Sequence, residues 1–280
     1  MAHRPHKGPR RPVGALPPAR KSLGQHFLRD TRVLDRIAAT LELGGSETVI
    51  EIGPGRGALT DRLAERCGRL IAIELDRALI PILRDRYASN ARVMILEGDV
   101  LTFDLGEVAQ GPYRLAGNVP YYITTPILFH ALRAPRPERA VFLVQREVAE
   151  RMAAAPDTDA YGALSVNLQA LATAEVVSVV KPAAFEPAPK VDSAIVRVVP
   201  RAAPLVTAEE EAGFARFVQG CFAQRRKQLG RTLRTVASLG ADEARELLTG
   251  LGVDPTARGE TLAPERFVAL YRALHATRNA

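Results

Sequence analysis

The stretch TVIEIGPGRGALT, residues 48–60, decides the fold. Its first five residues are mostly β-branched and predict a buried strand, and the residues after the loop predict a helix to about residue 66. Between the two lie Gly53, Gly55 and Gly57, where the backbone can bend sharply and approach a ligand closely. Because a helix N-terminus also favours negative groups, this order is typical of a ligand-binding edge of an α/β sheet. A purely structural glycine-rich turn is the alternative.

Outward from this stretch, strand-like and helix-like segments alternate. The predicted strands are 48–52, 70–75, 93–98, 113–118 and 141–146, and the predicted helices are 31–41, 57–66, 77–87, 123–133 and 146–155. Strands that alternate with helices in this way predict a parallel sheet with helices on both faces.

The pattern changes after the fifth strand. Two strands at 176–181 and 193–200 are joined by a proline-rich connection without a helix, which predicts an antiparallel pair at the end of the sheet. Beyond Arg201 the chain has helical character to its end. The sequence therefore predicts an α/β sheet that is parallel with an antiparallel end, followed by a small all-α domain. We place the boundaries at 1–21 for an N-terminal arm, 22–203 for the α/β domain and 204–280 for the helical domain.

The charge of the chain is concentrated at its N-terminus. The 280 residues carry a net charge of +7 with a pI near 9.8, and no acidic residue precedes Asp30. Lys, Arg and Pro recur through residues 1–21, which predicts a disordered basic arm. Such an arm either contacts a polyanion, nucleic acid foremost, or is a solvated tail, and charge alone does not separate the two.

Other classes of protein find little support in the sequence. No apolar run approaches the roughly 20 residues needed to span a bilayer, and the arm lacks the apolar core of a signal peptide. We therefore expect a cytoplasmic protein with no membrane partner. Cys67 and Cys221 lie far apart, and neither a CxxC nor an HExxH motif is present. We expect both cysteines to be small buried hydrophobes and expect no metal site.

Two acids mark the next strand ends. Glu74 ends the second strand, about twenty residues after the glycine loop, where a carboxylate can accept both ribose hydroxyls. Asp99 follows the third strand, where a carboxylate can accept from an adenine amine. Because ligands of open α/β sheets bind along this edge, the row predicts an adenosine-containing cofactor. With Ala58 the loop also fits the dinucleotide fingerprint, so it does not separate a nicotinamide cofactor from S-adenosylmethionine (SAM).

The fourth strand ends in LAGNVPYYITTP, residues 115–126. Asn118 offers a carbonyl acceptor, the Val119 backbone carbonyl offers another, and Pro120 fixes the direction of the chain. Tyr121 supplies a flat face on which a base can stack. Two acceptors that hold both hydrogens of adenine N6 would aim its lone pair outward, and no general base is needed before attack. For Tyr122 we expect core packing.

The N-x-P-Y segment after the glycine loop resembles the class I SAM-dependent amino-methyltransferases. Four more segments resemble one branch, the small-subunit ribosomal RNA adenine-N6,N6-dimethyltransferases (the bacterial RsmA/KsgA family). They are KSLGQHFLRD (21–30), YGALSVNLQ (161–169), FEPAPKVDSAIVRV (185–198) and FAQRRKQLGRTL (222–233). This resemblance runs from about residue 21 to the C-terminus. It implies a Rossmann-like catalytic domain, SAM as methyl donor, a helical rRNA-binding domain and a monomer that acts on 16S rRNA in the small ribosomal subunit or its precursor.

The resemblance also implies roles for individual residues. The catalytic contacts would be Asn118, Tyr121 against one face of the target adenine and Phe185 against the other. SAM would be held by His26, Leu28, Gly53, Gly55, Glu74, Asp99 and Asn118, and rRNA phosphates by Arg225, Arg226 and Lys227. The family often has Asn in place of His26 and Leu in place of Val119, two departures that leave the expected chemistry intact.

The implied activity is dimethylation of N6 on two adjacent adenosines in the hairpin loop near the 3′ end of 16S rRNA, linked to small-subunit biogenesis. An erythromycin-resistance-type enzyme of large-subunit rRNA shares the cofactor motifs, and the segment 222–233 argues against it. A nicotinamide oxidoreductase would leave Asn118 and Tyr121 without a role. A ribosome assembly factor that keeps the fold without catalysis is the third alternative.

Overall fold

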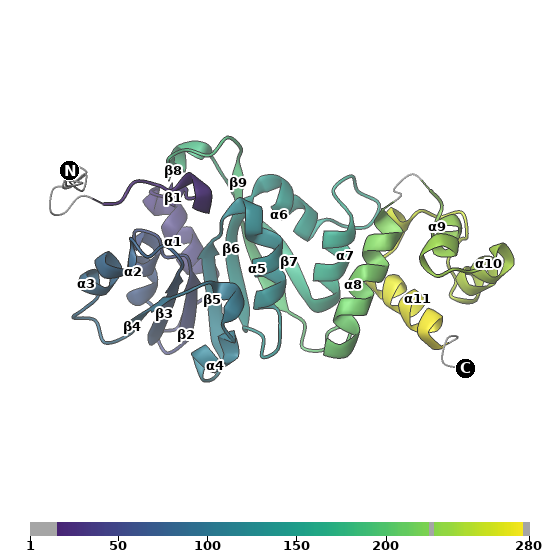
Figure 1. The fold of residues 1–280 in the computed structure, drawn as a ribbon, viewed down its shortest axis with the longest axis horizontal. Coiled ribbons are helices and arrows are strands. Elements are labelled where there is room, and N and C mark those ends of the chain that lie inside the picture. Colours follow the sequence, from purple (N-terminus) through teal and green to yellow (C-terminus); the bar gives the residue numbers. More distant parts are fainter. Residues whose placement is uncertain (1–15, 224–226, 277–280) are drawn as a thin grey trace, which may run out of the picture.

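The computed structural model describes residues 16–223 and 227–276, and its centre is one twisted sheet (Figure 1). Seven strands lie in the order β4-β3-β2-β5-β6-β9-β7. They are β2 (Thr48–Ile52), β3 (Arg69–Glu74), β4 (Val93–Glu97), β5 (Tyr113–Asn118), β6 (Arg139–Gln145), β7 (Ala172–Val180) and β9 (Ser193–Pro200). The strands from β4 to β6 are parallel, and β9 runs antiparallel between β6 and β7. The predicted parallel sheet with an antiparallel end is confirmed.

Seven helices of the described chain accompany this sheet. They are α1 (Thr31–Thr40), α2 (Ala58–Ala64), α3 (Ile80–Arg86), α4 (Leu105–Ala109), α5 (Thr124–Ala131), α6 (Arg146–Ala153) and α7 (Ala163–Leu171). Successive strand side chains point to opposite faces, so Val49 packs with α1 and α2 whereas Ile50 joins the cluster of α4 to α7. Burial on both faces explains why the strands read as continuous apolar runs.

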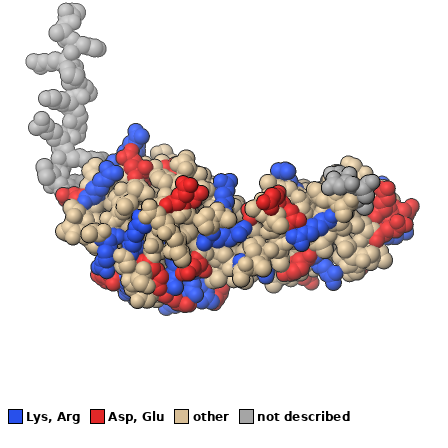
Figure 2. Space-filling model, turned by 90° about the horizontal axis from the view of Figure 1, so that it is seen from below, with Lys and Arg blue, Asp and Glu red and all other residues tan. Residues whose placement is uncertain are grey.

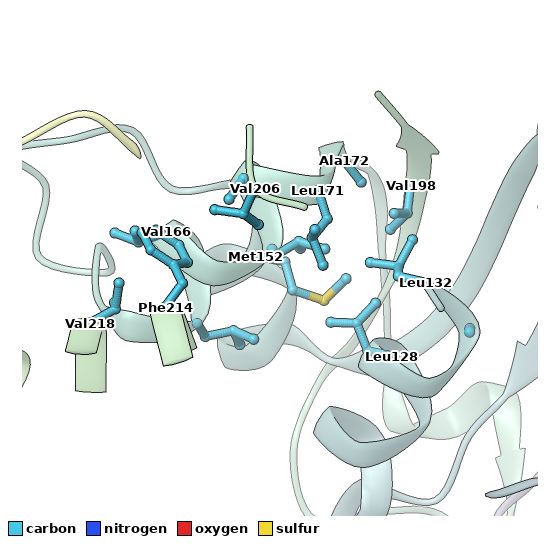
Figure 3. Close-up of a cluster of buried hydrophobic side chains, with 14 of the residues drawn as sticks. Leu128, Leu132, Met152, Val166, Leu171, Ala172, Val198, Val206, Phe214 and Val218 are labelled. Atoms are coloured by element: carbon cyan, nitrogen blue, oxygen red, sulfur yellow. The ribbon is translucent and has the colours of Figure 1, made fainter. Parts of the chain in front are cut away.

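The remaining helices extend the molecule to one side (Figure 1). They are α8 (Ala208–Phe222), α9 (Leu229–Val236), α10 (Ala241–Gly250) and α11 (Pro264–Ala276). The Thr207 side chain and Glu210 form a reciprocal capping box that starts α8. Helices α8 and α11 pack against α7, so Phe214 and Val166 belong to the same apolar cluster as Leu128 beneath the sheet (Figure 3).

A second, two-stranded sheet was not predicted. In it β1 (Phe27–Leu28) pairs antiparallel with β8 (Phe185–Glu186). Two residues are too few to show a period of two, and the partner lies far away in the sequence, so no local pattern indicates the pair. Helix α3 also begins at Ile80 instead of Arg77, because the Asp76 side chain accepts from the Ala78 N–H and turns the chain there.

Candidate active site

A cleft of about 990 Å³, its open mouth included, lies at the carboxyl ends of β2 to β5. Parallel strands deliver their ends to the same edge, which is why residues far apart in the sequence meet there. Seven of the residues predicted for the site line this cleft, namely His26, Gly53, Gly55, Glu74, Asp99, Asn118 and Tyr121.

The glycine loop forms the floor of the cleft after β2. Gly53 and Gly55 have φ angles of +67° and +58°, in the left-handed region that favours glycine. A Cβ at Gly55 would lie 3.0 Å from a ring carbon of Phe27, which packs directly on the loop. The loop therefore leaves room for a ligand above Gly53 and for an aromatic ring above Gly55.

Two carboxylates follow along the same edge. Glu74 is buried, and its two oxygens accept from the Gly55 N–H at 2.9 Å and from the Asp76 N–H at 2.8 Å. Burial raises the pKa of Glu74, although these hydrogen bonds act in the opposite direction. Asp99 accepts from the Leu101 N–H at 3.0 Å through Oδ1. In the part of the chain that the structure describes, Asp99 Oδ2 has no hydrogen-bond partner, so it remains available to a ligand.

Asn118 stands at the end of β5 with its amide orientation fixed. Its Nδ2 donates to the backbone carbonyl of His26 at 2.9 Å. This bond leaves Oδ1 as the free acceptor of the amide, because no residue of the described ranges donates to it. The next side chain, Val119, is buried and anchors the turn that follows.

Tyr121 presents a ring that is held from both ends. Its hydroxyl lies 2.6 Å from Ser193 Oγ, and its ring faces that of His26 at 5.9 Å between centroids and 22° between planes. Burial raises the pKa of Tyr121, with the hydrogen bond to Ser193 opposing the shift. The side chain therefore stays a neutral phenol at pH 7. His26 is positioned in turn by a 2.7 Å contact between Nδ1 and the Pro187 carbonyl.

The structure does not bring Leu28 and Phe185 to the cleft with the others. Both side chains are buried in the cluster that contains Leu34 and Ile195, because the β1–β8 pairing sets residues 28 and 185 opposite each other. Alternation along β1 turns Phe27 toward the cleft instead. The ring that faces Tyr121 in this structure is that of His26.

The expectation for Tyr122 was wrong. The side chain is 62% exposed and lies at the cleft, not in the core. Residues 121–123 form a short 3-10 turn, in which neighbouring side chains point in different directions. The Tyr121 side chain therefore points inward and the Tyr122 side chain outward. The amino-acid sequence alone does not indicate this difference.

An N-terminal segment, residues 16–28, supplies one wall of the cleft; we call it the strap. The resemblance implied contacts from His26 and Leu28 of this segment, whereas its anchoring at Asp76 was not predicted. Asp76, 1% exposed, accepts from Arg20 and from Gln25, both at 2.9 Å. Arg56 donates to the Pro17 carbonyl at 2.9 Å and lies over the Phe27 ring. Gln25, His26 and Phe27 of the strap line the cleft. The anchor was missed because Asp76, two residues after Glu74, carries no pattern by itself.

Glu51 lies beneath the glycine loop and was also missed. It is 1% exposed, and its Oε2 has no hydrogen-bond partner within the described residues. It lines a second, smaller cavity together with Gly53, Gly55 and Asn118. Burial foremost, and then the nearby charge of Glu74, raise the pKa of Glu51 to about 8.

The predicted phosphate contacts fall on a different part of the chain. Arg225 and Arg226 lie outside the described residues, and Lys227 is exposed just before α9. On the face seen in Figure 2, basic and acidic side chains are interspersed over both halves of the molecule. Among the described residues, no group of His, Cys, Asp and Glu is placed to hold a metal ion, and no helix is long and apolar enough to cross a membrane.

The sheet order and the row of strand-end groups define a class I methyltransferase. In the solved structures, a dimethyladenosine transferase from Plasmodium falciparum is 25% identical with a TM-score of 0.79, over 90% of this chain and 98% of that one. The 23S rRNA methyltransferase ErmE is 30% identical with a TM-score of 0.70, over 89% and 99% of the two chains.

Sequence comparison gives the family. The model of the ribosomal RNA adenine dimethylase family matches residues 18–275. A ribosomal RNA small subunit methyltransferase A from Geobacter sulfurreducens is 44% identical over 91% of this chain and 95% of its own, and one from Bacillus mycoides is 43% identical over 91% of each. The chain therefore belongs to the ribosomal RNA adenine dimethylase family, whose members take the methyl group from SAM and transfer it to adenine in RNA.

Proposed function

We propose that this enzyme dimethylates N6 of two adjacent adenosines in the hairpin loop near the 3′ end of 16S rRNA, acting as a cytoplasmic monomer on the small subunit or its precursor. The observation that carries the proposal is the amide of Asn118, which is held by its hydrogen bond to the His26 carbonyl and lines the same cleft as Tyr121. The relatives at 43–44% identity support the choice of RNA.

The cleft fits SAM by its shape and by its polar atoms. Gly53 leaves the floor open, because an added Cβ there meets its nearest neighbour atom only at 3.9 Å. Glu74 would accept from the ribose hydroxyls and Asp99 Oδ2 from the adenine amine. His26, just before β1, and Leu28, within it, would contribute through their backbone atoms. The Leu28 side chain itself points into the core. When bound, SAM supplies an electrophilic methyl group.

The protein would orient the target amine instead of activating it with a base. Asn118 Oδ1 and the Val119 carbonyl would accept the two N6 hydrogens, which aims the nitrogen lone pair toward the methyl donor. Tyr121, held by Ser193, would support one face of the adenine. Orientation of this kind lowers the activation barrier because the reacting groups have already lost their translational and rotational freedom on binding. We leave Phe185 out of the proposed contacts, because β8 would have to leave the core to supply it.

The choice of an unpaired loop adenosine follows from energetics. An adenosine outside a duplex is extruded into a pocket at lower cost than a paired one. We propose that Arg225, Arg226 and Lys227 contact phosphates of the same RNA, since Lys227 is exposed beside the helical region. The enzyme of large-subunit rRNA remains the second candidate, because ErmE shares 30% identity and the whole fold. A ribosome assembly role can coexist with catalysis.

The decisive experiment measures transfer of labelled methyl groups from SAM. Small subunits that lack the modification, free 16S rRNA and large-subunit rRNA are offered in parallel, and the modified positions are mapped. We expect dimethylation of two adjacent adenosines of 16S rRNA. Modification confined to large-subunit rRNA would establish the second candidate, and rRNA binding without SAM binding would establish the non-catalytic factor.

Asn118→Ala tests the observation on which the proposal rests. Removal of the fixed acceptor should lower kcat by about a hundredfold, comparable to the loss of one preorganised hydrogen-bond partner in other active sites. Asn90→Ala is the matched control, because Asn90 lies in a surface turn where its side chain accepts from the Arg92 N–H. Transfer by Asn118→Ala at the wild-type rate would remove the amide from the mechanism.

A further inference from the structure

Tyr122 is an aromatic residue that the proposed reaction does not use. It is 62% exposed, it borders the cleft, and its hydroxyl has no hydrogen-bond partner in residues 16–223 and 227–276. Single apolar side chains on a protein surface need no explanation by themselves. Tyr122 differs from such a residue in its position, because it directly follows the ring that is proposed to support the target base.

The Tyr122 ring is also held in place from below. A Cβ added to Gly24 would lie 3.3 Å from Tyr122 Cδ1 and 3.4 Å from Cε1, so the ring rests on the bare backbone of the strap. Gly24 has a φ of +59°, and Pro120 fixes the chain just before the two tyrosines. The exposed face is therefore presented by a rigid turn, and it meets a partner with little loss of conformational entropy.

A target adenosine remains covalently tied to its neighbours when its base enters the cleft. The neighbouring nucleotide is thus carried to the mouth of the cleft, where the free face of Tyr122 lies. Stacking suits an occupant there because every base has a π-face and no hydrogen-bond readout is needed. We propose that Tyr122 stacks on the base of the nucleotide adjacent to the target adenosine and so positions the RNA strand. This inference rests on the proposed function and adds a specific contact to it.

The test compares RNA hairpin substrates that carry an abasic site on either side of the target adenosine. For one side, we expect the abasic site to lower kcat/KM about tenfold with the wild-type enzyme, in the range of one lost base–aromatic stack. Tyr122→Phe keeps the ring and should show the same loss. Tyr122→Ala should respond less than twofold to that abasic site, because the contact is already absent. The effect should fall on KM for RNA and leave the Kd for SAM unchanged.

A second readout does not depend on catalysis. A 2-aminopurine at the adjacent position should lose fluorescence on binding to wild type and Tyr122→Phe, and keep it with Tyr122→Ala. Val191→Ala is the control, since Val191 is exposed but does not line the cleft. Equal abasic effects in all variants, or a raised Kd for SAM as the only change in Tyr122→Ala, would overturn the proposal. A wild-type enzyme that quenches 2-aminopurine but transfers no methyl group would instead refute the proposed function alone.

Discussion

Glu51 is a carboxyl group that the fold buries with no cationic partner among the residues that the structure describes. It occupies the strand just before the glycine loop, where β2 is covered on both faces. Removal from water disfavours its charged form, and the charge of Glu74 adds to the effect, so its pKa is raised to about 8. At pH 7 the group is mostly neutral in the folded protein and mostly charged in the unfolded chain.

This difference predicts a pH dependence of stability. The pKa of Glu51 is higher in the folded protein than in the unfolded chain. The unfolding free energy is therefore highest below about pH 4.5, where Glu51 is protonated in both states, and it falls as the pH rises to about 8. For the protein without SAM, we expect Glu51→Gln to flatten the profile of unfolding free energy by up to about 1.4 kcal/mol per pH unit in this window. Urea titrations from pH 5 to 9 measure it.

Glu97→Gln is the control for this series, since Glu97 is exposed and its one ion pair within residues 16–223 and 227–276 is with Arg77 on the surface. Its profile should run parallel to that of the wild type. If the Glu51→Gln profile were parallel as well, Glu51 would be charged in the folded protein, and the raised pKa would be wrong.

At the scale of single residues, the sequence indicated the part of the site that depends on strand ends. Gly53, Glu74, Asp99 and Asn118 could be placed together because parallel strands share an edge, a rule that needs no knowledge of side-chain direction. The positions of the Phe185 and Tyr122 side chains could not be predicted by this rule. They depend on the pairing of two distant short strands and on the direction of side chains in a three-residue turn.

At the scale of elements, the strap is held at several points, of which Asp76 anchors the part around Arg20 and Gln25. At this anchor, hydrogen bonds from Gln25, the Ala78 N–H and Arg20 lower the pKa of Asp76 against the effect of burial. Arg20 is half exposed, so the contact with Gln25 is the better shielded of the two side-chain bonds. The part of the strap around Arg20 and Gln25 is therefore anchored by one buried carboxylate.

Asp76→Asn should loosen this wall. The amide cannot accept from Arg20 and Gln25 together, and hydrogen bonds to a charged group contribute about 1.5–3 kcal/mol each. We expect the Kd for SAM to rise about tenfold and the strap to become susceptible to protease. Calorimetry and limited proteolysis are the measurements. Arg77→Ala removes only an exposed ion pair with Glu97 and should change neither. A strap that remains protected in Asp76→Asn would contradict the assigned anchor.

Elements with strong periodicity were predicted well and those with long-range causes were not. Strands 113–118 and 193–200 have the predicted bounds, because polar or proline residues mark both of their limits. Strand β7 begins at Ala172, before the predicted residue 176, because pairing with β9 extends it through Thr173 and Ala174. Tertiary pairing overrode local pattern in that case.

At the scale of the whole molecule, the apolar core crosses the predicted boundary near residue 204. Val166 of α7 and Phe214 of α8 lie in one cluster with Met152 and Leu128 (Figure 3). Phe214 also meets Tyr271 of α11 edge to face at 5.7 Å. The helical region thus shares packing with the sheet, which makes independent unfolding of the two regions unfavourable.

Phe214→Ala should therefore destabilise the whole chain. We expect a loss of about 3–5 kcal/mol in unfolding free energy, from lost burial and the cavity left behind. Circular dichroism and a fluorophore on α10 should report the same single transition in denaturant. Glu246→Ala, on the surface of α10, should stay within about 0.5 kcal/mol of the wild type. Two separate transitions in the wild type would show that the regions unfold independently.

The pairing of β1 with β8 also affects when the site can form during protein synthesis. A protein is synthesised from its N-terminus, so β1 is made long before its partner strand β8. A nascent chain that ends before residue 185 already contains the glycine loop, both carboxylates and Asn118. It still lacks β8, which pairs with β1, and Pro187, whose carbonyl contacts the His26 ring. We therefore expect tight binding of the methyl donor only after residues 185–187 have been made and have left the ribosome.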